Sequence, residues 1–148
     1  MMKVSKSTLD TFKNFASINT NLLIREGQVL STVSNSMNIL CRAQVTESFP
    51  REFAIYDLNQ FLSLLTMDEN ADLNFGDESV TVQSTAGKFE FFYAEPAVIK
   101  AAPDKEIEVE QLFNFDISED NIKTIYRAAS AISAPFLRVV GNNGDASL

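Results

Sequence analysis

Only a narrow range of chemistry is open to this chain, because it contains no histidine and a single cysteine, Cys41. Without histidine, the Ser–His and Cys–His pairs of nucleophilic catalysis and the usual ligand sets of zinc and iron are absent. Cys41 lies in an apolar, strand-like run, which favours a small core residue over a reactive thiol. Catalysis would therefore have to depend on carboxylates, lysines or tyrosines.

The carboxylates that could act in catalysis or metal binding have simpler structural explanations. Asp57 and Glu95 form a candidate pair for acid–base chemistry, but Asp57 directly precedes an apolar periodic segment and Gln60 follows three positions later. That pattern is typical of a helix N-cap. The acidic clusters at residues 68–69 and 104–110 lack the spacing of a calcium-binding loop. We expect no catalytic residue, no metal and no cofactor.

Basic residues are the remaining candidates for a functional surface. Five of them are placed near or on the polar faces of two expected helices: Lys3, Lys6, Lys13, Lys123 and Arg127. Lys6 and Lys13 are two helical turns apart and Lys123 and Arg127 one turn apart, so each pair shares a face. Taken alone, such residues most often form only a solvated face. Because the net charge is −8, any contact with nucleic acid would have to be local.

The elements that would position these side chains follow from the periodicity of apolar residues. Helices are predicted over residues 5–18, 57–67 and 118–132, and the segments between them read as short antiparallel strands joined by turns. The predicted strands cover residues 22–27, 28–34, 37–45, 53–56, 71–75, 79–85, 88–94, 112–117 and 136–140. The fold class is therefore α+β.

Composition limits the broader class of protein. With 148 residues, 45% of them apolar, the chain can bury one sizeable core and perhaps part of a second, and it is not a disordered tail. No apolar run approaches the roughly 20 residues of a membrane span, and charged residues near the N-terminus argue against a signal peptide. We expect a cytoplasmic protein with no membrane contact.

A connector and a repeat divide the chain. Residues 95–110 contain two prolines and many acids without an amphipathic period, which predicts an extended connector. An offset of 113 positions aligns Ser5 with Ser118 and Thr11 with Thr124, and the helical and strand periods coincide. We expect a complete first domain at 1–95, a connector at 96–110 and a truncated second domain at 111–148.

Three stretches carry a resemblance to a known family. They are KVSKSTLDTFKNFASIN, FAIYDLNQFLSLL and the run from APDKEIEV into FDISEDNIKTIYRAAS. In them the chain resembles the DNA polymerase sliding clamps of T-even-type bacteriophages. The resemblance implies a clamp fold, in which each domain has antiparallel sheets on the outer side and two helices on the inner side. Three subunits would close a homotrimeric ring of six domains.

The same resemblance implies function and partners. The protein would be a non-catalytic processivity factor that encircles duplex DNA without regard to sequence and tethers the replicative DNA polymerase after loading by a clamp loader. Its DNA-facing residues would be Lys3, Lys6, Lys13, Lys123 and Arg127, while Val98, Ile99, Pro103 and Ile107 would border a groove for partner peptides. Those four residues could equally be ordinary packing residues of a linker.

Family members are longer than this sequence, so the expected second domain is partial and no ring is expected from this fragment. The expected location is the cytoplasm of an infected bacterial cell. Two other classes stay open. A non-enzymatic α+β regulatory or ligand-binding module would need a closed apolar pocket, and a hydrolase would need two carboxylates converging in one cleft.

Overall fold

The computed structural model describes residues 1–142 and 144–147, and it divides into two compact units, Met1–Asp104 and Lys105–Leu148. The division falls inside the stretch expected as a connector, and the domain bounds themselves stay a prediction. Positions 143 and 148 of the expected second domain lie outside the described residues.

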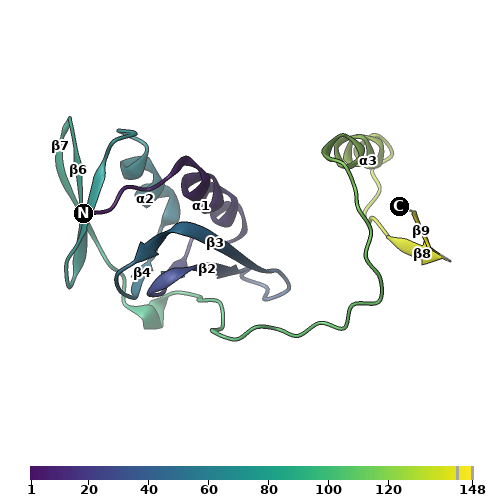
Figure 1. Cartoon of the computed structure of the whole chain (residues 1–148), viewed down its shortest axis with the longest axis horizontal. Helices are drawn as coiled ribbons and strands as arrows, with labels where there is room; N and C mark the ends of the chain where they lie inside the picture. The colour runs from purple at the N-terminus through teal and green to yellow at the C-terminus, as the bar shows by residue number, and fades with distance from the viewer. Residues whose placement is uncertain (143, 148) are drawn as a thin grey trace. The chain divides into compact units, whose positions relative to one another are not determined.

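The N-terminal unit alternates helices with antiparallel strands, which confirms the α+β class (Figure 1). Its elements are α1 (Lys6–Ile18), β1 (Leu22–Ile24), β2 (Gly27–Val33), β3 (Leu40–Phe49), β4 (Phe53–Ile55), α2 (Leu58–Leu65), β5 (Asp72–Phe75), β6 (Ser79–Ser84), β7 (Gly87–Phe92) and the 3₁₀ turn η1 (Pro96–Val98). The strands pair as β1–β4, β2–β3 and β5–β6–β7, all antiparallel.

Helix α1 is fixed at its start by a side-chain cap and along its length by an apolar stripe. Ser5 accepts a hydrogen bond from the Thr8 N–H, which satisfies one of the free amides of the first turn. Phe12, fully buried, meets Phe49 of β3 and Phe61 of α2, with ring centroids 6.3 Å away in each case. Burying such a ring stabilises the fold by roughly 2–3 kcal/mol, so α1 has one orientation on the core.

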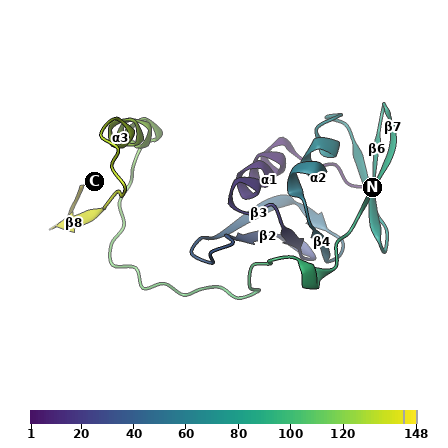
Figure 2. The same ribbon diagram turned by 180° about the vertical axis from the view of Figure 1, so that it is seen from behind.

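Helix α2 begins where the sequence predicts. The Asp57 carboxylate accepts hydrogen bonds from the N–H groups of Asn59 and Gln60, at 2.9 and 3.2 Å, which confirms the N-cap. Figures 1 and 2 show α1 and α2 side by side on the same side of the β2–β3 hairpin. The two helices therefore form a layer that lies against the β2–β3 hairpin, while β6 and β7 stand at the edge of the unit.

The C-terminal unit contains α3 (Glu119–Ala131) and a hairpin of β8 (Val140–Asn142) and β9 (Asp145–Ser147). Helix α3 repeats the local construction of α1. Ser118 accepts from the Asn121 N–H just as Ser5 accepts from the Thr8 N–H. Thr124 donates to the Asp120 carbonyl, as Thr11 does to that of Ser7. The two helices share this spacing of capping and hydroxyl residues, and each has 13 residues.

Two expectations for this unit are wrong in the described structure. Residues 112–117 form no strand, since a strand needs a neighbour to satisfy its backbone groups and none of the described strands pairs with them. The strand expected from Phe136 starts only at Val140. The apolar stripe of α3 is not buried, because the short β8–β9 hairpin supplies little surface to cover it. Within the described residues, no helix is both long and apolar enough to cross a membrane.

Candidate nucleic-acid interface

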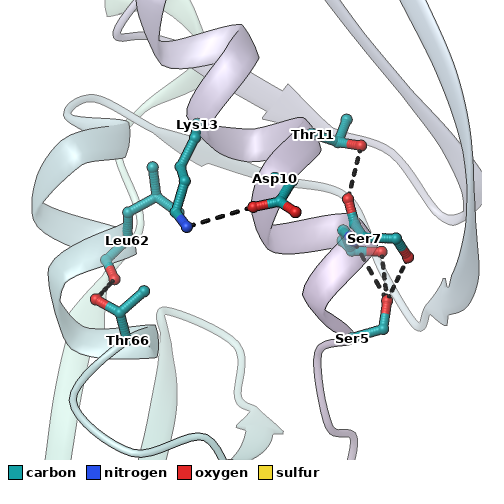
Figure 3. A network of polar contacts seen from close by, with 8 residues as sticks. Ser5, Ser7, Asp10, Thr11, Lys13, Leu62 and Thr66 are labelled. Carbon is teal, nitrogen blue, oxygen red and sulfur yellow. Dashed lines mark hydrogen bonds and ion pairs between the residues drawn. The ribbon is translucent and has the colours of Figure 1, made fainter.

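The polar face of α1 carries both of the lysines predicted there. Lys6 and Lys13 are exposed, on the side of the helix away from Phe12. Lys13 Nζ lies 3.4 Å from Asp10 Oδ1, and both side chains are more than half exposed (Figure 3). Among the described residues, Lys6 has no ion-pair partner. The face thus holds two positive charges and one negative charge, which gives a weak net attraction for anions.

Lys3 lies just before α1 and is exposed. It acts on Asp68, which follows α2. The pKa of Asp68 is held below its usual value first by the Thr85 backbone N–H, then by the Asn70 N–H, and to a small extent by the charge of Lys3. Asp68 is therefore a carboxylate that stabilises a turn, and the charge of Lys3 interacts with it weakly.

Helix α2 adds polar but uncharged groups to the same layer. Asn59, Gln60 and Ser63 are exposed, and none of them is basic. Since α2 packs beside α1, the two helices together present lysine, amide and hydroxyl groups. Amides and hydroxyls can contact phosphate oxygens without any sequence preference.

The two cations predicted on α3 are exposed in the C-terminal unit. Lys123 Nζ lies 2.6 Å from Glu119 Oε1 on the same helix, and Arg127 has no ion pair among the described residues. Whether these two side chains face the same way as Lys6 and Lys13 stays a prediction.

Glu47, which the sequence reading missed, fixes the start of α1. This carboxylate on β3 is only 8% exposed and accepts hydrogen bonds from the Ser5 N–H and the Thr8 hydroxyl. Burial raises the pKa of Glu47, but these hydrogen bonds more than offset it and bring the pKa to about 2. The signal for it was present, because Glu47 stands at an inward position between buried Val45 and Phe49.

Three of the four predicted partner-binding residues lie in the N-terminal unit, and the fourth lies in the C-terminal unit. Val98 is 60% exposed, Ile99 is half-buried and Pro103 is exposed. Pro103 lines a concavity of about 570 Å³ beside Arg25, and neither Val98 nor Ile99 is among its lining residues. Ile107, 61% exposed, belongs to the other unit. A groove bordered by all four stays a prediction.

Other residues hold the first part of the connector against the N-terminal unit. Asn19, which is 3% exposed, donates through Nδ2 to the carbonyls of Val33 and Lys100, at 2.9 and 3.1 Å. Arg25 Nη2 donates to the Ala102 carbonyl at 2.9 Å. In turn, Lys100 Nζ donates to a carbonyl of the loop between β2 and β3. These side chains donate to backbone carbonyls. The pattern of apolar residues in the connector therefore could not predict which residues anchor it.

The structure does not place the candidate catalytic pair, Asp57 and Glu95, in one concavity. Asp57 caps α2, whereas Glu95 lines a concavity that Asp57 does not reach. Asp77 and Glu78 line the same concavity as Glu95, and Asp77 is paired with Arg51 at 2.8 Å. Across the part of the chain that the structure describes, no cluster of side chains could hold a metal ion.

Comparisons with known proteins agree with the sequence resemblance. Residues 3–92 match the family of DNA polymerase processivity factors. The chain is 35% identical over 135 residues to the sliding clamp of Vibrio phage KVP40, which covers 88% of this chain and 61% of that protein. It is 25% identical over 147 residues to the sliding clamp of Escherichia phage RB69, covering 97% and 64%. For the sliding clamp of Enterobacteria phage T4 the identity is 29% over 108 residues, covering 72% and 47%.

The chain therefore spans less than two thirds of the length of these relatives. The family match extends from just before α1 to the end of β7, so it includes both helices of the N-terminal unit and all three of its sheets. This chain belongs to the DNA polymerase processivity factor family, and its named relatives are sliding clamps of T4-like bacteriophages.

Proposed function

We propose that this chain serves in a DNA sliding clamp, a non-catalytic ring that encircles duplex DNA and tethers the replicative DNA polymerase. The observation that carries the proposal is the family match over residues 3–92, within which α1 and α2 form one layer with an exposed polar face. That face becomes the inner wall of the ring. The protein acts in the cytoplasm of the infected bacterium.

The charge on α1 suits sliding. Lys6 and Lys13 attract the phosphate backbone, and Asp10 beside Lys13 reduces that attraction. The exposed amides of α2 add phosphate contacts that do not depend on the DNA sequence. Because encirclement prevents dissociation, weak contacts are enough, and strong ones would slow movement along the duplex.

The ring is assembled from repeated domains. We assign the first clamp domain to residues 1–95, the connector to 96–110 and part of a second domain to 111–148. The matching caps and hydroxyl bonds of α1 and α3 support this repeat. In the clamp, α3 brings Lys123 and Arg127 to the inner wall, as α1 brings its lysines, and Lys3 joins them at the edge. Three subunits form the ring.

The connector serves the protein partners. Val98, Ile99, Pro103 and Ile107 border a groove that takes an apolar peptide from the polymerase or the clamp loader. Asn19, Arg25 and Lys100 support this role, because they hold the connector backbone and leave Val98 exposed.

A domain exchange tests the function. This chain replaces the matching segment of the KVP40 sliding clamp, and the chimera is added with that phage's polymerase and clamp loader to a singly primed circular template. Products several-fold longer than without a clamp are expected, as with the parental clamp. A chimera that folds and assembles like the parent but leaves product length unchanged would contradict the proposal.

A further inference from the structure

A groove of about 390 Å³ lies at the far end of the β5–β6–β7 sheet from the turn between β6 and β7. It is lined by β4, by the turn between β5 and β6, and by the segment that leaves β7. The lining residues are Glu52, Phe53, Ala54, Asp77, Glu78, Phe92, Tyr93, Ala94, Glu95 and Pro96. No residue of α1 or α2 lines it, so it is separate from the face assigned to DNA.

The walls of the groove are aromatic. The ring of buried Phe53 lies 4.9 Å from that of Tyr93, centroid to centroid, so these two rings pack on each other. Phe92 is 66% exposed, although a side chain of this size is usually covered. Aromatic faces carry a negative electrostatic potential and attract cations as well as apolar groups.

The charge of the lining has a single sign. It includes four carboxylates, Glu52, Asp77, Glu78 and Glu95, and no lysine or arginine. Within the described residues, Glu78 and Glu95 have no ion pair, and Glu52 reaches Arg25 only at 3.9 Å. Since like charges near one another raise each other's energy, a cation entering the groove would relieve this repulsion.

Two residues that line the groove, Tyr93 and Asp77, already bind the guanidinium of Arg51. Arg51 lies with Cζ 5.9 Å from the centroid of the Tyr93 ring, and Nη1 donates to Asp77 Oδ1 at 2.8 Å and to the Gly76 carbonyl. Arg51 already contacts Tyr93 and Asp77, so the partners left for a second cation are exposed Phe92 and the carboxylates of Glu78 and Glu95.

We propose that this groove binds a basic segment of a partner protein, with an arginine or lysine against exposed Phe92 and its charge among Glu78, Glu95 and Glu52. Nucleic acid is the less suitable occupant, because its phosphates would meet four carboxylates. A cavity of this size holds one or two side chains, which fits an extended peptide better than a folded surface.

The test measures binding of a fluorescein-labelled peptide, Arg-Lys-Phe-Lys-Arg, to the whole chain by fluorescence anisotropy at low salt. The groove variant is Glu78→Gln with Glu95→Gln. A matched control, Glu26→Gln with Glu69→Gln, removes the same charge from exposed positions outside the groove. Loss of two rim carboxylates is expected to weaken binding about fivefold, and the control variant less than twofold.

A second variant separates specific docking from bulk attraction. Phe92→Ala leaves the charge unchanged and is expected to weaken binding about threefold, while the amide signals of Phe92 and Tyr93 move in the NMR spectrum when the wild-type protein takes up peptide. Equal losses in the groove and control variants, or NMR changes centred elsewhere, would overturn the proposal. A groove variant that changes self-association but not peptide binding would also overturn the proposal, because the groove would then bind a second copy of the chain.

Discussion

The buried carboxylate of Glu47 gives the sharpest prediction about stability. Glu47→Gln removes the charge that accepts hydrogen bonds from the Ser5 N–H and the Thr8 hydroxyl at the start of α1. Its pKa in the folded protein is about 2, against an ordinary value of 4.5. At about 1.4 kcal/mol per pKa unit, ionised Glu47 contributes about 3 kcal/mol to the free energy of unfolding at neutral pH.

The pH dependence follows from the direction of that shift. Because the folded state holds the carboxylate in its charged form, the contribution is complete above the unfolded pKa and is lost as pH falls through the folded pKa. At pH 3 it has fallen to about 1.4 kcal/mol. The wild type should therefore exceed the Gln variant in stability by about 2–3 kcal/mol at pH 7, and the gap should narrow steadily below pH 5.

Urea unfolding followed by far-ultraviolet circular dichroism at several pH values measures this gap. Glu69→Gln, at an exposed position, is the control and should change stability by less than about 0.5 kcal/mol. A gap between wild type and Glu47→Gln that stays the same at pH 7 and pH 3 would refute the argument, because a lowered pKa requires the two curves to converge.

Three other perturbations test the helix face, the cap and the connector. Lys6→Ala with Lys13→Ala should weaken binding to short duplex DNA and reduce its salt slope by about 2, whereas Lys88→Ala on β7 should have no such effect; equal slopes in all three proteins would remove the lysines from the interface. Asp57→Ala should lower the free energy of unfolding by about 1 kcal/mol, and a change near zero by thermal unfolding would mean that the cap contributes nothing. Asn19→Ala should speed hydrogen exchange of the connector amides, since their anchor is lost, and unchanged exchange rates would contradict the anchoring role.

Patterns local in sequence predicted the N-terminal unit well. The spacing of apolar residues such as Phe12 and Phe15 placed α1, and Asp57, followed by Gln60 three positions later, placed the start of α2. Gly87, at a φ of 147°, confirms a turn that the sequence placed beside it. Helix caps, apolar stripes and tight turns depend only on residues close in sequence, so they can be predicted from the sequence alone.

Features that need distant partners were missed. The alternation of Phe113 and Phe115 predicts a strand, but alternation cannot supply the neighbouring strand on which pairing depends. Asn19 and Lys100 are 81 positions apart, and nothing in either segment indicates that the amide of one meets the carbonyl of the other. The sequence predicted which basic residues share a face of α1 or of α3. Whether the basic faces of the two helices point the same way depends on how the two units assemble, which local patterns do not encode.

The most direct test of the central claim is an NMR titration of the isotope-labelled protein with two short duplexes of unrelated sequence. If the helix layer faces DNA, both duplexes should shift the same amide signals, those of α1 around Lys6 and Lys13 and those of α2, and the shifts should vanish as salt is raised. Shifts centred on the strands, or a different pattern for each duplex, would contradict it.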